Sequence, residues 1–443
     1  MIVSSRSLRG AAIGLAAALA ALAWLVSGWI GPRGQAGLGA LCFIAICAAF
    51  SPDLRAVRWR SVAWGMAIQL GLALVILRLE VGGVRPGYAF FAAVGDLVKR
   101  FLEFSNQGAL FVFGPLANPA TLEGALGAGN GFVFAFLALP TIIFISSFFT
   151  ILYYFGVLQV IVWAMARVMM YALGTSGAET LSAAANVFMG QTEAPIIVKP
   201  YVPDMTRSEL LALMVGGMAT ISGGVMAVYI GLGADPIAIL TTSVMAAPCG
   251  LYLSKLLLPE TETARTSGAI RLTIERHHVN VIDAASAGAS DGLMLAFNVA
   301  AMLIAFLALI AMADAFLGWM REGLTLASVF SIVFAPVAFL MGVPPRDIGP
   351  MADLLGTKLV ANEFVAFVKL TTEYRGVVEP RTHVLATYAL TGFANIGSIG
   401  IQLGGIGAMA PTRRQDLARL GTRALLAGFL ATLINACVAS MIL

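Results

Sequence analysis

The sequence predicts an all-α polytopic membrane protein with about nine transmembrane helices, two oppositely oriented re-entrant hairpins and interfacial helices. Three observations predict this fold class. Of the 443 residues, 59% are hydrophobic and only 11% are Asp, Glu, Lys or Arg, against about 25% charged residues in a typical soluble domain. Several apolar runs approach or exceed the ~20 residues that span a bilayer. Two further apolar segments resemble each other, and each is interrupted by a polar cluster that contains one carboxylate.

Composition and charge exclude several functions. The net charge of +4 comes from basic residues in short segments between apolar runs, which is the usual signal of membrane topology and does not indicate a nucleic-acid partner. The cysteines lie in apolar runs without the spacing of metal ligands, so we expect small buried hydrophobic residues at Cys42, Cys47, Cys249 and Cys437. The adjacent His277 and His278 lie in a polar loop, and a histidine metal site is not expected.

The first apolar segment, Ala11–Ile30, follows Arg6 and Arg9. A signal peptide has a similar charged start and apolar middle. Here the apolar stretch is long, no clear A-x-A cleavage site follows it, and another apolar segment begins by Ala36. These features favour a helix that is retained in the protein.

The next segments, at about 36–51 and 61–81, are joined by an arginine-rich loop. The positive-inside bias places this loop, and with it the N-terminus, in the cytoplasm. Residues 88–105 have an apolar and a charged face at helical spacing, which predicts an amphipathic helix on the membrane surface. A helix packed against partner helices is the alternative. A long span at about 131–163 follows, with Pro140 inside it.

The remaining elements alternate between spans and short loops. A helix at about 206–232 begins with Thr206-x-x-Glu209, which is the pattern of a capping box. After a turn at Asp235–Pro236, residues 237–257 cross back. The stretch from Pro259 to about Asp291 is the only long polar linker and predicts a cytoplasmic loop. The later apolar segments lie at about 292–318, 325–343, 383–403 and 420–442. An arginine-rich connection before the last span places the C-terminus in the periplasm.

Two regions do not fit simple spanning helices. The segments Ala183–Pro203 and Gly349–Leu370 are each too short on either side of a polar cluster to cross the membrane, so each predicts a re-entrant hairpin. Each is followed by a spanning helix with a glycine- and hydroxyl-rich interruption, at Gly216–Val225 and Thr391–Gly400. The first hairpin enters from the cytoplasm and the second from outside. This layout is typical of an inverted-repeat transporter, whose substrate site lies at the paired interruptions.

The polar clusters indicate the chemistry of the site. A carboxylate inside a membrane segment costs at least ~2.5–3.5 kcal/mol, so Glu193 and Glu363 are predicted to be functional; the alternative is that each accepts hydrogen bonds from nearby broken backbone. Lys199 and Lys358 are predicted to lie at the hairpin flanks. Two carboxylates without a committed cation suit a neutral ligand with vicinal hydroxyls and ring N–H groups, such as a nucleoside or a sugar. Amide and hydroxyl groups that both donate and accept accompany them at Gln191, Thr192, Asn395 and Ser398.

Several motifs resemble those of the concentrative nucleoside transporters. They are Gly190-Gln-Thr-Glu-Ala-Pro195, Lys199-Pro200-Tyr201, Met205-Thr-x-Ser-Glu209, Ala361-Asn-Glu-Phe-Val-Ala366 and Gly392-Phe-Ala-Asn-Ile-Gly-Ser398. The likeness extends from about residue 36 to the C-terminus. It implies a bacterial inner-membrane homotrimer in the lipid bilayer that imports nucleosides with sodium by an elevator motion. A proton-coupled symporter of nucleosides, sugars or nucleobases is the alternative. An intramembrane enzyme is not expected, because the sequence has no intramembrane His–Glu or paired-Asp catalytic signature.

The resemblance also implies roles for particular residues. Those that contact the nucleobase would be Gln191, Thr192, Glu193, Val225 and Phe393, and those that hold the ribose hydroxyls would be Glu363, Asn395 and Ser398. A sodium ion would be bound by the Asn186 side chain, the Thr220 hydroxyl and the carbonyl oxygens of Met189 and Ile221. Thr220 stands where a serine is common and Met189 where a smaller residue is common, but neither change removes the ligand atom.

The resulting domain organisation places an inverted-repeat transport domain on a scaffold domain. Residues 1–35 form the extra N-terminal transmembrane helix, and residues 36–165 form mainly scaffold helices with the amphipathic interfacial helix. Residues 166–258 form the first transport repeat, with a hairpin and a broken helix. After the cytoplasmic loop, 259–291, residues 292–345 supply a scaffold helix and a connecting segment. Residues 346–443 form the second transport repeat, with a hairpin, a broken helix and the last helix.

Overall fold

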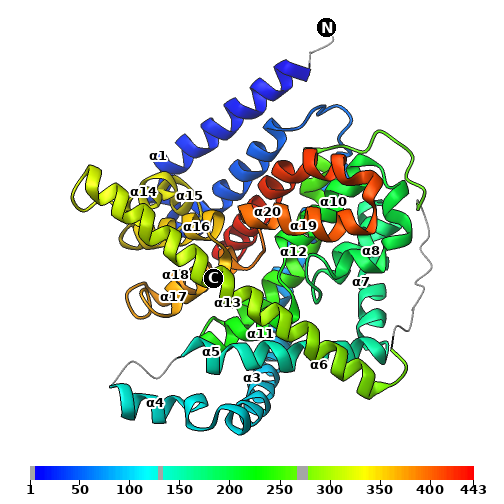
Figure 1. The fold of residues 1–443 in the computed structure, drawn as a ribbon. Coiled ribbons are helices and arrows are strands. Elements are labelled where there is room, and N and C mark those ends of the chain that lie inside the picture. Colours follow the sequence, from blue (N-terminus) through cyan, green and yellow to red (C-terminus); the bar gives the residue numbers. More distant parts are fainter. Residues whose placement is uncertain (1–4, 128–132, 267–277) are drawn as a thin grey trace.

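A computed structural model describes residues 5–127, 133–266 and 278–443. Throughout these ranges the regular structure is helical, apart from one isolated bridge between Val81 and Val84 (Figure 1). Apolar segments adopt helices in a membrane because a helix satisfies its own backbone hydrogen bonds where water is absent. The sequence-based prediction of an all-α protein is therefore confirmed.

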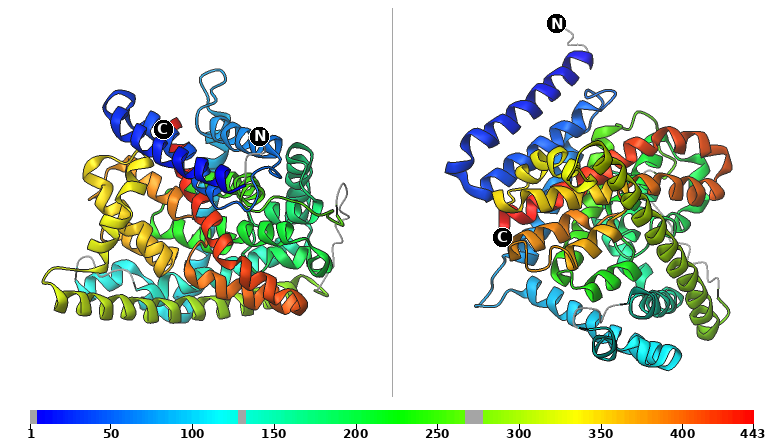
Figure 2. Two further views of the ribbon diagram at one scale, coloured as in Figure 1. Left: turned by 90° about the horizontal axis from the view of Figure 1, so that it is seen from above. Right: turned by 60° about the vertical axis from the view of Figure 1, so that its left-hand side comes forward.

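The first element, α1 (Ser5–Ala49), is a pair of helices joined by a tight turn. Gly31 has φ 63° and ψ −177°, and Pro32 follows it. Near one end of the pair Arg9 Nε donates to the carbonyl oxygen of Ser51 over 2.7 Å. Within the pair, Cys42 Sγ contacts the carbonyl oxygen of Ala16 at 3.4 Å. The two halves therefore run antiparallel (Figure 2), as expected for separate segments at 11–30 and 36–51. Helix α2 (Trp59–Leu77) follows.

Helix α3 (Pro86–Phe113) is longer than the amphipathic helix predicted at 88–105. Its apolar side packs on partner helices, since the Phe101 ring lies 4.5 Å from that of Phe148 and Gly95 lies against Pro236. The charged side is exposed, together with Leu97 from the predicted apolar side. These contacts agree with a helix packed against partners, and its position on the membrane surface stays a prediction. Two short elements follow, η1 (Gly114–Ala117) and α4 (Pro119–Leu126).

The prediction of one long span at 131–163 is wrong. The chain forms α5 (Phe134–Leu137), α6 (Leu139–Tyr154) and α7 (Val157–Leu173). Gly156 has φ 79° and separates α6 from α7, and this left-handed conformation suits glycine because it has no Cβ. Pro140 lies in the first turn of α6, where proline is tolerated, and introduces no kink.

The first repeat contains the first predicted hairpin and broken helix. The hairpin consists of α8 (Gly177–Ala185), α9 (Ala194–Ile197) and η2 (Lys199–Asp204), so it begins six residues before the predicted start. The broken helix consists of α10 (Arg207–Ala219) and α11 (Gly223–Leu232), and α12 (Pro236–Leu257) crosses back. The predicted capping box is confirmed: Glu209 N donates to Thr206 Oγ1 over 3.1 Å and Thr206 N donates to Glu209 Oε2 over 2.8 Å.

Helix α13 (Val281–Met320) begins inside the segment that was predicted to be a loop up to about Asp291. The side chain of Asn280 caps it by accepting from Asp283 N over 2.9 Å. Residues 267–277, which include His277, lie outside the described residues. Gly288 and Gly292 allow α13 to lie along α6, because a Cβ at either position would come within 2.8 Å of α6 atoms. Figure 2 shows α13 as a long helix along one edge of the molecule.

The second repeat follows a connecting segment of α14 (Leu326–Val333), α15 (Ala335–Leu340) and η3 (Pro345–Asp347). Its hairpin consists of α16 (Ile348–Val360) and α17 (Glu363–Thr371). Its broken helix consists of α18 (Pro380–Leu390) and α19 (Ile396–Met409), and η4 (Pro411–Arg413) leads into α20 (Arg414–Ile442). The order of elements, a hairpin, a broken helix and a long helix, is the same as in the first repeat.

Seven helices in the described ranges are long and apolar enough to cross a membrane. This number counts α1 once, although it doubles back, and leaves out the shorter helices α18 and α19. The prediction of about nine crossings therefore stays a prediction. The helices differ in burial: α10–α11, α12 and α20 are mostly buried, whereas α1 and α13 expose most of their apolar residues. The repeats therefore form the interior. All four cysteines are buried and unbridged, as expected.

Candidate functional site

The two helix breaks are in direct contact. Phe393 N, in the second break, donates to the carbonyl oxygen of Thr220, in the first, over 3.1 Å. Gly392 has φ 148°, and a Cβ there would lie 3.1 Å from the carbonyl oxygens of Met218 and Ala219. A side chain at this position would separate the two backbones, so glycine is required for the breaks to meet.

Three helix N-termini surround one cavity beside this contact. The N-cap residues of α11, α17 and α19 are Ser222, Asn362 and Asn395, and all three line the cavity. Each side chain accepts a hydrogen bond from the first turn of its own helix. Because the N-terminal end of a helix carries partial positive charge, this arrangement stabilises carboxylates and electron-rich ligand atoms that lie in the cavity.

Glu363 is the first residue of α17 and is buried at this cavity. Its carboxylate accepts from Asn395 Nδ2 over 2.8 Å and from the Tyr229 hydroxyl over 3.2 Å. Ser398 is held nearby, since its backbone N donates to Asn395 Oδ1 over 2.8 Å. The three residues expected to hold the ribose hydroxyls thus form one hydrogen-bonded group.

The first hairpin supplies the other side of the cavity. Gln191 Nε2 donates to Ser398 Oγ over 3.3 Å, which joins the two halves of the site. The other amide atom, Gln191 Oε1, is buried and has no hydrogen-bond partner among the described residues. Glu193 Oε2 accepts from Gly190 N over 3.0 Å, and its side chain is exposed toward the cavity. The structure therefore leaves an amide oxygen and a carboxylate of this hairpin available to a ligand.

All the predicted substrate residues line the same cavity of about 160 Å³. They are Gln191, Thr192, Glu193, Val225, Glu363, Phe393, Asn395 and Ser398. The opposite wall is apolar and comes from α13, through Leu295, Val299 and Met302. Such a lining of apolar surface with a few placed polar groups is typical of a small-molecule site. A second cavity of about 200 Å³ adjoins it and shares Glu193, Ser222 and Leu295. Glu193 therefore lies between the two cavities.

The residues predicted to bind sodium lie together at the first helix break. Asn186 and Thr220 are the C-terminal caps of α8 and α10, and helix C-termini carry partial negative charge. Asn186 Oδ1 is fully buried and has no hydrogen-bond partner in the described ranges, while its Nδ2 donates to Ser182 O over 2.9 Å. The Thr220 hydroxyl donates to Gly216 O over 2.9 Å, which leaves its lone pairs free to accept.

The hairpin tip is fixed beside this break, because Gly223 N donates to the carbonyl oxygen of Phe188 over 2.8 Å. This contact brings the adjacent Met189 and the buried Ile221 to the same region. An unpaired amide oxygen with neutral hydroxyl and carbonyl oxygens is a suitable ligand set for a hard cation. No group of three or more His, Cys, Asp or Glu that would hold a transition metal occurs in the described part of the chain.

Two residues of this region were not predicted from the sequence. Tyr229 is fully buried, bonds Glu363 and stacks on Phe367 with 4.1 Å between ring centroids. The sequence does contain a signal for Tyr229, because it lies one helical turn after Val225 on α11 and so shares its helix face. Lys358 was expected at a hairpin flank but is fully buried, and its ammonium donates to Ala389 O over 2.6 Å. Lys199, the other predicted flanking lysine, is exposed.

Tyr229→Phe is expected to weaken ligand binding without preventing folding. The change removes one of the two side-chain donors to Glu363, which is then held in position by Asn395 alone. One hydrogen bond of this kind contributes about 1 kcal/mol, or about fivefold in affinity. Calorimetric titration of the purified variant with its ligand measures the change.

Tyr252→Phe is the matched control for this prediction. Tyr252 is also fully buried and donates to Gln69 Oε1 over 2.9 Å, but it does not line the cavity. The control is expected to lower the melting temperature while leaving affinity unchanged. Equal affinities of wild type and Tyr229→Phe would show that Tyr229 does not position Glu363.

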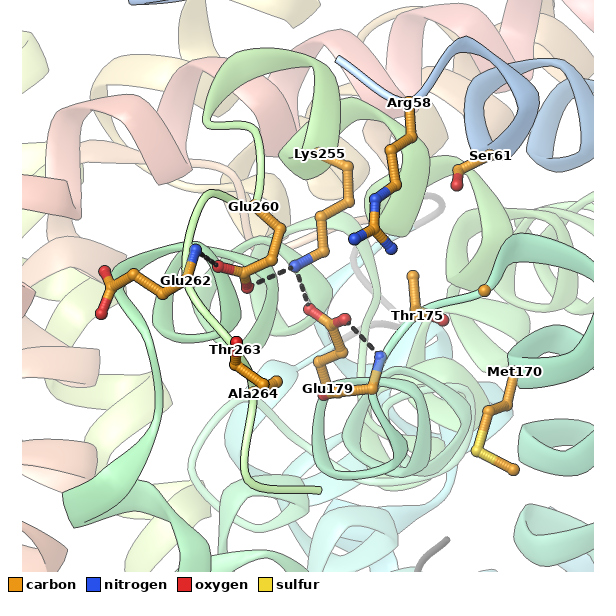
Figure 3. Close-up of a pocket in the computed structure, with 12 residues that line it drawn as sticks. Arg58, Ser61, Met170, Thr175, Glu179, Lys255, Glu260, Glu262, Thr263 and Ala264 are labelled. Carbon is orange, nitrogen blue, oxygen red and sulfur yellow. Dashed lines mark hydrogen bonds and ion pairs between the residues drawn. The ribbon is translucent and has the colours of Figure 1, made fainter. Parts of the chain in front are cut away.

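A separate charged cavity of about 330 Å³ lies at the base of the first hairpin (Figure 3). Lys255 Nζ, from α12, lies 2.6 Å from Glu179 Oε2 and 3.5 Å from Glu260 Oε2. Glu179 also completes a capping box with Ser176, whose hydroxyl donates to Glu209 over 2.5 Å. This network ties the starts of α8 and α10 to the end of α12. It shares no lining residue with the cavity at the breaks and is a structural clamp.

Comparisons with known proteins agree with this architecture. Models of the N-terminal and C-terminal parts of Na+-dependent nucleoside transporters match residues 38–116 and 238–440, and a nucleoside-recognition model matches residues 135–236. An uncharacterised transporter of Haemophilus influenzae is 42% identical over 91% of this chain and 96% of its own length. Sodium/nucleoside cotransporter 1 of Mus musculus is 40% identical over 97% of this chain and 67% of its own length.

Solved structures of the transporter CNTnw have the same fold. Its inward-facing, substrate-bound structure has a TM-score of 0.87 and 39% identity, and the match covers 92% of this chain and 97% of CNTnw. A variant of CNTnw in an outward-facing state has a TM-score of 0.86. These matches support a transporter over an enzyme. The chain therefore belongs to the Na+-dependent, concentrative nucleoside transporter family.

Proposed function

We propose that this protein imports nucleosides by symport with sodium and moves them by elevator-type alternating access. The observation that carries the proposal is the meeting of both hairpins and both helix breaks at one cavity, with an unpaired buried amide oxygen at the adjacent break. Relatives named sodium/nucleoside cotransporters support the substrate and the ion. CNTnw, solved in inward-facing, outward-facing and intermediate states, supports alternating access.

The polar groups of the cavity suit the two parts of a nucleoside. Glu363, Asn395 and Ser398 form a linked group that can accept from and donate to a pair of ribose hydroxyls. On the opposite side, Gln191 and Glu193 present free oxygens to ring N–H groups, and Phe393 with Val225 offers apolar contact to a flat base. A sugar would use only the first set, so the second set favours a nucleoside.

Sodium binding at Asn186, Met189, Thr220 and Ile221 would couple the ion to the substrate. Asn186 and Met189 belong to the hairpin tip that also carries Gln191 and Glu193, and Thr220 and Ile221 belong to the adjacent break. An ion held between them would join the hairpin to the break and order the nucleobase side of the cavity. Proton coupling is the alternative, and the exposure of Glu193 to two cavities is the observation that favours it.

The organisation in the membrane follows from the same assignment. The interior repeats, 166–258 and 346–443, would be the moving body, and α6 with α13 would belong to the scaffold. The exposed apolar side of α13, which includes Phe297, Ile304 and Phe316, would face lipid or the other subunits of a homotrimer. The protein would lie in a bacterial inner membrane with a cytoplasmic N-terminus and a periplasmic C-terminus, as the arginine distribution indicates.

The site is expected to bind nucleosides, to discriminate against 2′- or 3′-deoxy forms and to reject nucleotides. Loss of one ribose hydroxyl leaves a buried polar group of the Glu363 cluster unpaired, at about 1–3 kcal/mol, or about five- to 150-fold in affinity. A phosphate would enter a cavity with two carboxylates and no lysine or arginine among its lining residues. Competition against labelled uridine or adenosine measures both effects.

Two results would contradict this prediction. Inhibition by a nucleoside monophosphate as strong as that by its nucleoside would refute the charge argument. Equal inhibition by free ribose would show that the base side of the cavity contributes nothing and would identify a sugar carrier.

A further inference from the structure

Lys358 is a fully buried lysine at the second helix break. It lies near the end of α16, and its Nζ donates to the carbonyl oxygen of Ala389 over 2.6 Å and to Thr432 Oγ1 over 2.9 Å. Nζ also lies 5.5 Å from the ring centroid of Phe429. A buried lysine at membrane depth is costly unless it is paired or has a function.

The helix break leaves the carbonyl oxygen of Ala389 without its backbone donor. In a continuous helix it would accept from the N–H of Phe393, four residues later. That N–H donates instead to Thr220 in the other repeat. The ammonium of Lys358 takes the place of the missing donor at the C-terminal, partially negative end of α18.

Burial opposes a charge on this lysine, but the groups that contact Nζ suit an ammonium. Thr432 Oγ1 donates its own proton to Phe429 O, so it presents lone pairs to Nζ. The third direction at Nζ faces the electron-rich Phe429 ring, which attracts a cation and would repel the lone pair of a neutral amine. All three contacts of Nζ suit an ammonium, and in that form Lys358 places a positive charge at the second break.

The first break has the same construction without a lysine. The carbonyl oxygen of Ala219 loses its donor, because the N–H of Gly223, four residues later, donates to Phe188. The first hairpin arm approaches this helix end through Asn186, since a Cβ at Gly216 would lie 3.0 Å from Asn186 Nδ2. Asn186 Oδ1 is the unpaired acceptor described above. One break is thus completed by an ammonium, and the other has an unpaired amide oxygen and no cationic side chain at the corresponding place.

We propose that Lys358 is a built-in cation: it does for the second repeat what the dissociable sodium ion does for the first. This inference rests on the proposed function, because it requires that a sodium ion completes the first break. Its consequence is that nucleoside binding takes up one dissolved cation, although the fold contains two equivalent helix breaks. Lys358 is a positioning residue, which acts through α18 and the hairpin arm and has no contact with the cavity.

The charges of the two hairpin tips agree with this division. Glu363 follows Lys358 by five residues in the same hairpin, so its carboxylate has an ammonium counterpart within the hairpin. Glu193 has no buried lysine in its hairpin, where the single lysine, Lys199, is exposed. The first hairpin thus depends on a dissolved ion for charge balance and the second does not.

Lys358→Met tests the proposal, because methionine keeps the length of the side chain and removes the charge. Uridine or adenosine binding to the purified protein is titrated at a series of sodium concentrations, with choline chloride keeping the ionic strength constant. Below saturating sodium, the slope of log (1/Kd) against log sodium concentration counts the ions taken up with the nucleoside. We expect a slope of about one for wild type and about two for Lys358→Met, with binding at low sodium about tenfold weaker, as for loss of a charge-assisted bond.

Three further variants separate charge from packing. Lys358→Gln keeps a donor for Ala389 without a charge and is expected to behave like Lys358→Met, which covers the case that methionine fails to fold. Lys358→Arg keeps the charge, and Thr432→Val removes one oxygen at the ammonium while the lysine stays. Both are expected to keep the wild-type slope.

The outcomes distinguish this inference from the proposed function. A wild-type slope of zero would overturn sodium coupling and the inference with it. A wild-type slope of about one, with the same slope in both neutral variants, would overturn the inference alone and leave Lys358 a packing residue. A steeper sodium dependence confined to the neutral variants would establish Lys358 as the resident cation.

Discussion

Glu363→Gln is expected to nearly abolish nucleoside uptake while the protein still folds. The carboxylate accepts from Asn395 and Tyr229 and lies at the N-terminus of α17, so it is oriented and stabilised before any ligand binds. A glutamine keeps the shape but replaces one acceptor oxygen by an NH₂ donor group, and charge-assisted bonds of this kind contribute about 1.5–3 kcal/mol each. Uptake of labelled nucleoside, normalised to the amount of folded protein, measures the loss.

Glu209→Gln is the matched control for Glu363→Gln. Glu209 is as buried as Glu363, but it belongs to the capping box of α10 and does not line the cavity. Uptake is expected to persist in the control, which shows that loss of a buried carboxylate does not by itself stop transport. Normal uptake by well-folded Glu363→Gln would remove Glu363 from the substrate site.

Asn186→Ala is expected to raise the sodium concentration needed for half-maximal uptake by about tenfold. The substitution removes one ligand oxygen, and we take the lost interaction as comparable to one hydrogen bond, about 1.4 kcal/mol. Thr220→Ala should act in the same direction, because it removes the neighbouring hydroxyl. The ranking of nucleosides by affinity should not change, since neither residue lines the substrate cavity. Uptake measured over a range of sodium concentrations provides the test.

Asn435→Ala is the control for this substitution. Asn435 is an equally buried asparagine that bonds Gln69 and Thr242 and lines neither cavity at the breaks. Its replacement should lower the melting temperature and leave the sodium dependence unchanged. If Asn186→Ala and Asn435→Ala shift the sodium dependence equally, Asn186 is not an ion ligand.

The parts of the fold that were predictable have local signals. Polar clusters and glycines interrupt apolar runs at both hairpin tips and both breaks, and the capping box of Thr206 and Glu209 marks where α10 begins. These residues cause the interruptions directly, because the polar side chains form hydrogen bonds with the broken backbone and the glycines adopt the conformations that it requires. The polar substrate residues could be named for the same reason, whereas Val225 and Phe393 were named only from the family resemblance. The structure brings all of them to one cavity.

The parts that were not predictable depend on tertiary context. Gly156 separates α6 from α7 inside a continuous apolar run, and nothing in the run distinguishes this glycine from one in a helix. The start of α13 was assigned to a loop because its first turns are rich in small and polar residues. Lys358 looked like a flanking charge, since its partners, Ala389 and Thr432, are distant in sequence and become neighbours only after folding.

Nucleoside accumulation in proteoliposomes under an imposed sodium gradient tests the central claim most directly. Labelled uridine or adenosine is supplied outside, with the pH equal on both sides and choline replacing sodium in the control. The proposed function predicts uptake above the external concentration with an inward sodium gradient, and only equilibration with choline. Accumulation driven by an inward proton gradient in the absence of sodium, with no response to sodium itself, would contradict sodium symport.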